Sequence, residues 1–215
     1  MSLAAGCPRC STPVVEVPER SGTGWSCPEH GEISPLWRPR EVTYNDFAAH
    51  LLASIGFPTY LPWPVSPGWS VTDFAVVGDG REKAMATLTC TSGPSEQDGP
   101  VDLVVITEEA GVGLGGRCAG TPHDDPGVEV EQGPPTVHVR TDNQQVPLWA
   151  VSTSGTAGDL DRSVVAGEAL GRWLWLVLRP ASAILLLRED WILRDVSGLG
   201  PPLVETPFGG PAPLW

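Results

Sequence analysis

Four residues near the start of the chain have the types and the spacing of a metal site: Cys7, Cys10, Cys27 and His30. They form two ligand pairs, each with two residues between its members, and sixteen residues separate the pairs. Thiolate and imidazole groups are the ligands that Zn²⁺ prefers, and four of them complete a tetrahedron. The pattern therefore predicts a zinc ribbon with a structural Zn²⁺, because a closed site leaves no position for a substrate.

A glycine-rich run at residues 111–116 is the second candidate site, and it formally matches the dinucleotide-binding pattern. That fingerprint needs a helix whose N-terminus faces the pyrophosphate, and Gly120 and Pro122 interrupt any helix here within a few residues. The run therefore favours a turn or a close-packed bend. A ligand-binding loop stays the alternative, since glycines let a ligand approach the backbone closely. Its candidate residues are Gly111, Gly113, Gly116 and Arg117.

The histidines outside the ribbon pattern do not form a convergent catalytic set. His123, Asp124 and Asp125 lie in a loop rich in Pro and Gly, where solvated side chains are the rule. His138 lies between two valines of a strand-like segment and is expected on the surface. His50 is expected near the polar side of a helix.

Three tryptophans lie close to proline or glycine: Trp63, Trp69 and Trp149. They either edge a groove for an apolar ligand or a proline-rich peptide, or they clamp the proline-rich linker internally. An exposed surface of Trp and Pro is therefore one candidate for binding a protein partner, and the ribbon is the other.

The chain divides into four predicted segments. Residues 1–40 form the zinc ribbon, and residues 41–68 form an amphipathic helix with a linker rich in Pro and Trp. Residues 69–200 form an α+β domain built mainly on an antiparallel sheet, and residues 201–215 form a loose tail rich in Pro and Gly. The expected fold class is therefore α+β.

A helix is predicted over residues 43–56, with Thr43 as its N-cap and Asp46 completing a capping box. Gly56 ends it. The residues expected on its apolar stripe are Tyr44, Phe47, Ala48, Leu51, Leu52 and Ile55.

Short apolar runs bounded by Gly, Pro, Asp or Ser predict the strands of the main domain. In the run at 172–178 apolar residues occupy both faces, which indicates a central strand covered on both sides. Gly171 is expected at a hairpin corner, and residues 189–196 fit either a short helix or a strand. The predicted strands are Trp69–Val77, Ala84–Thr91, Val101–Thr107, Thr136–Arg140, Leu148–Ser152, Ser163–Leu170, Arg172–Leu178 and Ile184–Leu187.

Charge and composition bound the partners and the compartment. The formal net charge is −13, so general binding to nucleic acid or to an anionic membrane surface is disfavoured. No signal peptide is visible, and the longest apolar stretch, Trp173–Leu178, is far short of a membrane span. Cys90 and Cys118 could pair only if the fold brings them together. Unpaired thiols and a thiolate metal site suit a reducing cytoplasm.

The chain also resembles a domain-of-unknown-function family from actinobacteria, whose members begin with a CPxC knuckle and a WxCxxHG knuckle. The resemblance implies a zinc-ribbon-like start and supplies no catalytic residues, although some members carry an automatic phosphotransacetylase label. The segments that carry it are WSCPEHG (25–31), LPWPVSPGW (61–69), EEAGVGLGGRCAG (108–120), DDPG (124–127), VPLWAVS (146–152) and DRSVVAGEALGRWLWLVLRP (161–180).

Two functions are consistent with these observations. The first is a non-enzymatic cytoplasmic protein whose ribbon has a structural, regulatory or partner-docking role. The alternative is a small-molecule-binding protein or an acyl or phosphoryl transferase that uses the glycine-rich loop 111–116. The oligomeric state does not follow from the sequence.

Overall fold

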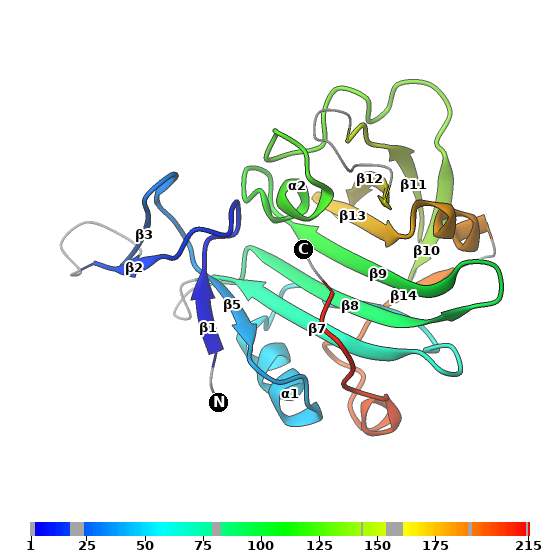
Figure 1. Cartoon of the computed structure of the whole chain (residues 1–215), viewed down its shortest axis with the longest axis horizontal. Coiled ribbons are helices and arrows are strands. Elements are labelled where there is room, and N and C mark those ends of the chain that lie inside the picture. The colour runs from blue at the N-terminus through cyan, green and yellow to red at the C-terminus, as the bar shows by residue number, and fades with distance from the viewer. Residues whose placement is uncertain are drawn as a thin grey trace.

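A large, strongly curved sheet dominates the computed structural model, which describes residues 3–17, 24–78, 83–142, 144–153, 161–188, 191–213 and 215 (Figure 1). The strands of this sheet are β1 (Leu3–Gly6), β5 (Leu36–Pro39), β6 (Tyr60–Pro62), β7 (Ser70–Val77), β8 (Ala86–Ser95), β9 (Gly99–Glu108), β10 (Val137–Thr141), β11 (Gln144–Ala150), β12 (Ser163–Ala169), β13 (Arg172–Arg179) and β14 (Ile192–Asp195). A second, small sheet contains β2 (Val15–Glu16), β3 (Trp25–Cys27) and β4 (Gly31–Glu32). The helices are α1 (Tyr44–Ala53), α2 (Leu114–Ala119) and the 3₁₀ helices η2 (Ala181–Arg188) and η3 (Pro201–Glu205).

The order of strands in the large sheet is β1-β5-β7-β8-β9-β13-β12-β11-β10-β14-β6. Neighbouring strands are antiparallel, apart from the parallel pair β10 and β14. The described part of the chain is thus mostly sheet with few helices, in agreement with the predicted α+β class.

Strand β13 is central and covered on both faces, as its sequence predicts. Leu174 and Leu176 point into one buried cluster, whereas Trp175 and Val177 point into another. A hairpin joins it to β12, and both corner residues have positive φ, 54° at Leu170 and 75° at Gly171. Such a turn matches the twist of the two strands.

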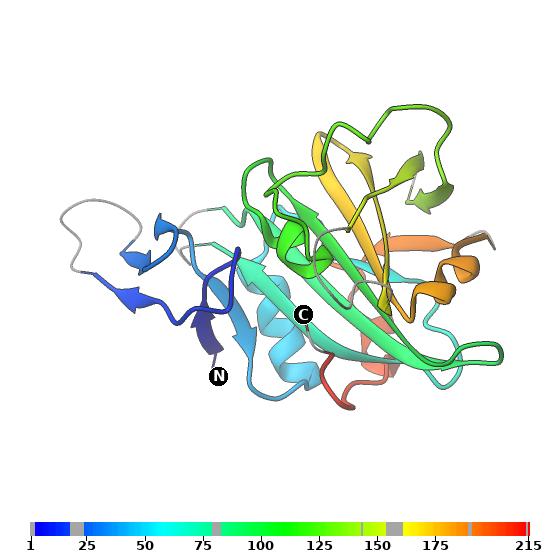
Figure 2. The ribbon, with the colours of Figure 1, turned by 45° about the horizontal axis from the view of Figure 1, so that its top comes forward.

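The sheet curls so that its far end covers one face of its long middle strands (Figure 2). The hydroxyls of Thr87 and Thr89 on β8 donate to the backbone carbonyls of Pro58 and Tyr60, at 2.6 Å each. Edge strand β6 therefore lies against the face of β8, and the cluster that contains Leu174 is enclosed within the curl.

Two elements differ from their sequence-based predictions. The run Ile184–Leu187 lies in the 3₁₀ helix η2, so the predicted strand is wrong there. Ile184 and Leu187 lie three residues apart, the spacing of a 3₁₀ helix, and both pack in the enclosed cluster. Residues 192–195 form β14, which decides between the helix and the strand expected around that segment. Residues 189–190 lie outside the described residues.

Helix α1 has the predicted N-cap, because the Thr43 hydroxyl accepts a hydrogen bond from the Asp46 backbone N–H at 3.2 Å. The predicted apolar stripe is only partly buried. Phe47 is fully buried, whereas Leu52 is 70% exposed. His50, expected near the polar side, is instead buried against the rings of Phe47 and Phe74, and burial lowers its pKa to about 3.

The first forty residues do not stand wholly apart from the large sheet. Strand β1 pairs with β5, and β5 pairs with β7, so both ends of this segment belong to the large sheet. The small sheet between them projects from the body of the molecule (Figure 1). The C-terminal segment is packed rather than loose, because the Val71 N–H donates to Pro207 and the Gly209 N–H donates to Val71. The four segment boundaries stay predictions.

We expect Phe47→Ala to lower the free energy of unfolding by about 3–5 kcal/mol, because it leaves a cavity under α1. Leu52→Ala on the same helix is the matched control and should change stability little, since this side chain is 70% exposed. Chemical denaturation followed by far-UV circular dichroism measures both. Equal losses in the two variants would contradict the packing described for α1.

Candidate metal centre

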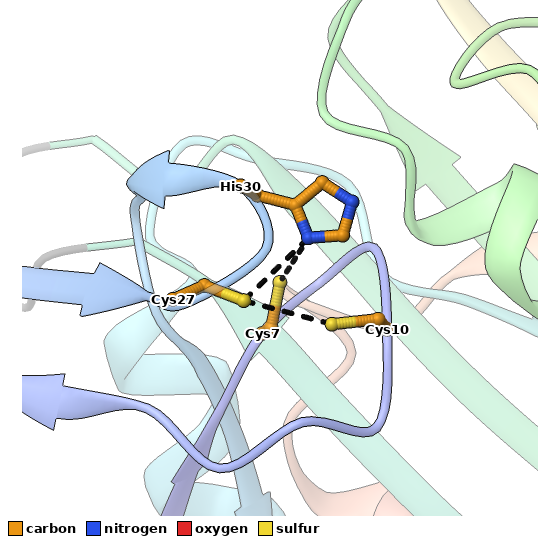
Figure 3. A group of neighbouring side chains, drawn as sticks. All are labelled: Cys7, Cys10, Cys27 and His30. Atoms are coloured by element: carbon orange, nitrogen blue, oxygen red, sulfur yellow. Dashed lines mark hydrogen bonds between the residues drawn. The ribbon is translucent and has the colours of Figure 1, made fainter.

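The four predicted ligands come together where the ribbon meets the large sheet (Figure 3). Cys7 and Cys10 lie on the turn that follows β1, Cys27 ends β3, and His30 lies on the turn before β4. Their ligand atoms all lie within 4.8 Å of one another. The two ligand pairs are brought together because β2, which follows the first pair, pairs with β3, with Val15 opposite Ser26.

The distances match those of a tetrahedral site. Cys10 Sγ and Cys27 Sγ are 3.6 Å apart, and His30 Nδ1 lies 3.6 Å from Cys7 Sγ and 3.5 Å from Cys27 Sγ. In a Zn²⁺ tetrahedron with ordinary bond lengths, two sulfurs are about 3.8 Å apart and a sulfur and a nitrogen about 3.6 Å. His30 presents its Nδ1 atom to the thiols (Figure 3). The four residues therefore lie close enough together to hold a metal ion.

The site lies in a very small core. Cys7, Cys27 and Ile33 are the buried members of its cluster, and Trp25 packs against them. A cluster of so few apolar side chains stabilises a small unit only weakly, and in small domains a metal cross-link commonly supplements such a core.

Burial and hydrogen bonding divide the thiols. Burial raises the pKa of Cys7 to about 11, although the Arg9 N–H donates to its sulfur at 3.4 Å. Burial also acts to raise the pKa of Cys27, but the backbone N–H groups of Glu29 and His30, together with the Cys10 and Cys7 thiols, outweigh it, and the net pKa is lowered. Backbone donors aimed at sulfur are thus already present in both knuckles, where they favour the thiolate that binds metal.

Two arginines connect the first knuckle, residues 7–10, with the glycine-rich loop. The Arg9 guanidinium donates to the carbonyls of Gly111, at 2.5 Å, and Val112, at 3.3 Å, and it pairs with Asp124 at 3.4 Å. In the opposite direction, Arg117 donates to the Cys7 carbonyl at 2.6 Å. Each of the two segments therefore supplies an arginine that donates to backbone carbonyls of the other.

The glycine-rich loop opens a short helix after all. Gly113 is left-handed, with φ of 84°, and α2 follows it for six residues until Gly120. The N–H groups of Leu114 and Gly115 at the start of α2 donate to the buried carboxylate of Glu108, at 2.8 and 3.1 Å. The place where a helix N-terminus would receive an anion is thus filled by a side chain of the same chain.

Two of the glycines allow close packing. A Cβ atom on Gly115 would lie 2.2 Å from the Trp175 indole nitrogen, and one on Gly116 would lie 2.1 Å from the His123 carbonyl oxygen. Helix α2 therefore approaches β13 more closely than any other residue type permits, which agrees with the close-packed bend favoured by the sequence. Ligand binding by Gly111, Gly113, Gly116 and Arg117 stays a prediction.

The loop that carries His123, Asp124 and Asp125 borders a hollow of about 780 Å³. Asp124 pairs with Arg9, and Asp125 accepts a hydrogen bond from the Gly111 N–H at 2.8 Å. Asp125 therefore binds the glycine-rich loop directly, and Asp124 binds Arg9, which itself donates to that loop. His138 is exposed on β10, as expected.

The tryptophans near proline have internal partners. Trp69 is 8% exposed and its indole N–H donates to the Pro94 carbonyl at 3.1 Å. Trp149 donates to Gly133 at 3.1 Å, and Trp63 packs against the cluster under α1. The partners of Trp69 and Trp149 lie outside the proline-rich linker, so both interpretations of these residues stay predictions.

Sequence reasoning missed Arg9 as the docking residue of the first knuckle. Its position between the two cysteines was the only signal, because its partners lie more than a hundred residues away in the chain. Cys90 and Cys118 are both free and buried, so the structure does not pair them. Within the described ranges, no helix is both long enough and apolar enough to cross a membrane.

The fold and the site define a curved-sheet protein with a small N-terminal sheet, beside which three cysteines and one histidine form a group that could hold a metal ion. The chain belongs to a family of unknown function (DUF6758), whose model matches residues 1–215. No curated protein and no solved structure matches it.

Burial raises the pKa of Glu108 from 4.5 to about 7, against the opposing effect of its two backbone donors. The folded state therefore keeps a proton that the unfolded state loses, and the stability this group contributes is full below pH 4.5 and is lost as the pH rises through 7. The loss amounts to about 3 kcal/mol.

We expect the stability of the wild type, relative to non-titrating Glu108→Gln, to fall over that pH interval. Denaturant titrations of both proteins between pH 5 and pH 8, with metal content checked at each pH, measure the difference. A difference that does not change with pH would contradict a buried, proton-retaining Glu108.

Proposed function

We propose that this protein binds Zn²⁺ through Cys7, Cys10, Cys27 and His30, and that the ion is structural. The supporting observation is the closed set of four ligand atoms, at tetrahedral spacing, two of them on fully buried cysteines. Three thiolates and one imidazole favour Zn²⁺ over oxygen-preferring cations such as Mg²⁺ or Ca²⁺.

A structural role follows from the absence of an open coordination position in such a set. A catalytic Zn²⁺ keeps a water or a substrate as its fourth ligand, whereas here the protein supplies all four. The ion would hold the two knuckles together, and Arg9 and Arg117 would then fix the first knuckle on the glycine-rich loop. The proposed function is therefore non-enzymatic, with the ribbon as a module positioned by the sheet domain.

The role of the positioned ribbon is partner docking. Its small sheet projects from the body, and β2 is an edge strand of that sheet (Figure 1). Val15 on β2 is an apolar side chain that is 56% exposed. An exposed edge strand with an apolar side chain is a template on which an extended segment of another protein can pair.

A reducing compartment such as the cytoplasm fits this proposal. All five cysteines are free, and three of them would act as thiolate ligands. Oxidation of a ligand pair would remove the metal site, so the ribbon depends on a compartment that keeps thiols reduced.

The alternative function, small-molecule binding or group transfer at loop 111–116, receives less support. The N-terminal donors of α2 are directed at Glu108, and Arg117 is directed at the Cys7 carbonyl. A phosphate at this loop would have to displace a buried carboxylate and the knuckle itself.

We expect protein purified in reducing buffer to contain about one equivalent of zinc by inductively coupled plasma mass spectrometry, because four protein ligands complete the site. Cys10→Ser should lose most of it, as a thiolate ligand is removed. Cys90→Ala is the matched control, a buried free cysteine outside the cluster, and should retain the metal. Substoichiometric zinc in the wild type, or equal loss in both variants, would overturn the metal assignment.

We expect Val15→Asp to retain zinc but to lose proteins captured by the wild type from a native lysate, because a charge on β2 opposes strand pairing. Val128→Asp is the control, since Val128 is 82% exposed and lies in the loop that follows α2. Quantitative mass spectrometry of the captured proteins compares the three forms. The same proteins recovered by all three would rule out docking through β2.

A further inference from the structure

The indole ring of Trp215 lies in a niche formed by three separate elements. Asp73 comes from β7, Arg38 from β5 and Arg117 from α2. The indole N–H of Trp215 donates to Asp73 Oδ2 at 2.8 Å. The guanidinium carbons of Arg38 and Arg117 lie over the ring, 4.4 and 5.2 Å from its centroid. The ring also packs against the buried cluster on that face of the sheet.

Asp73 is the polar anchor of this niche. Its side chain is 1% exposed, and it accepts hydrogen bonds from the Phe74 N–H, at 2.9 Å, and from Trp215, and an ion pair from Arg38. The pairing of β7 with β8 is irregular between Val71 and Asp73. Irregularities of this kind redirect a side chain, and a buried carboxylate is stable only while its donors are in place.

The three groups together match one kind of ring. A carboxylate acceptor requires a ring that carries an N–H or O–H donor, and guanidinium groups within about 6 Å favour the face of an electron-rich aromatic ring. Apolar side chains beneath the ring favour a large hydrophobic surface. Phenylalanine supplies no donor, and a smaller hydrogen-bonding group supplies no ring face. Indole meets all three requirements.

A short segment that follows Gly210 carries Trp215 into the niche. The segment is held to the sheet as far as Gly209, whose carbonyl accepts from the Ser70 hydroxyl at 2.8 Å. Gly209 and Gly210 then adopt positive φ, 106° and 117°. Among the described residues beyond Gly210, Pro213 is buried and Trp215 donates the hydrogen bond to Asp73.

We propose that this niche is an indole-binding site that Trp215 fills in cis, and that it accepts a free indole compound when Trp215 is absent. The recognised group is the tryptophan side chain itself, for which 3-methylindole is the free equivalent. The residues that form the niche are not among the proposed metal ligands. A purely structural Trp215 would leave a gap that collapses or takes any apolar ring.

The experiment uses the full chain with Trp215→Gly and measures thermal unfolding across a 3-methylindole titration. The variant should melt about 4–8 °C below the wild type, because the buried Asp73 loses a donor and the cluster loses a ring. Ligand at ten times its dissociation constant should raise the melting temperature by about 3–6 °C, with saturation. The wild type should shift much less, since the tethered Trp215 competes.

Two comparisons separate indole recognition from apolar filling. The N-methylated analogue of 3-methylindole keeps the ring but lacks the N–H, and it should stabilise Trp215→Gly far less. Adding Asp73→Asn to that variant should abolish the stabilisation by 3-methylindole. Equal shifts with the two compounds, or equal shifts in the wild type and the variant, would overturn the proposal.

If Trp215→Gly does not fold, Trp215→Phe provides the same test. This variant keeps a ring near Arg38 and Arg117 but has no donor for Asp73, so 3-methylindole should still displace the ring and raise the melting temperature. The absence of a shift in that variant would likewise overturn the proposal.

Discussion

The apolar character of both faces of the central strands is the constraint on which the rest of the structure depends. β13 and β9 alternate between two buried clusters, so neither face can be left to solvent. The sheet covers one face by curling its β10–β14 end over it. The other face needs a separate cover, and α2 with the glycine-rich loop provides it. The closeness of Gly115 to Trp175 shows how tightly that cover is fitted.

Two buried carboxylates fix α2 and the C-terminal segment in place on this face of the sheet. Glu108 fixes the start of α2, and Asp73 fixes Trp215 and Arg38. Both carry a pKa raised by burial, which is the cost of placing acids beneath a cover. Each carboxylate accepts hydrogen bonds from donors of the protein itself. The ribbon and the C-terminal segment are therefore attached to the sheet by specific polar contacts as well as by apolar area.

Local patterns in the sequence predict those features of the structure that are determined by residues close together in the chain. The metal ligands, the Thr43 cap, the hairpin corner at Gly171 and the doubly covered strand all follow from spacing over a few residues. The errors concern long-range packing. His50 is buried because Phe74, on another element, lies opposite it. The run Ile184–Leu187 is helical, and its side chains pack in the enclosed cluster that distant strands form. No local pattern links Arg9 or Trp215 to partners more than a hundred residues away.

One side chain joins the metal knuckle to the C-terminal segment. Arg117 donates to the Cys7 carbonyl, and its guanidinium also lies over the Trp215 ring. A guanidinium is planar and rigid, so its orientation cannot be adjusted for one partner without affecting the other. Whatever fixes Cys7 therefore also favours the arginine geometry that the ring requires, and the reverse holds by thermodynamic linkage. Residues 7 and 215, at opposite ends of the sequence, are thus coupled through a helix of six residues.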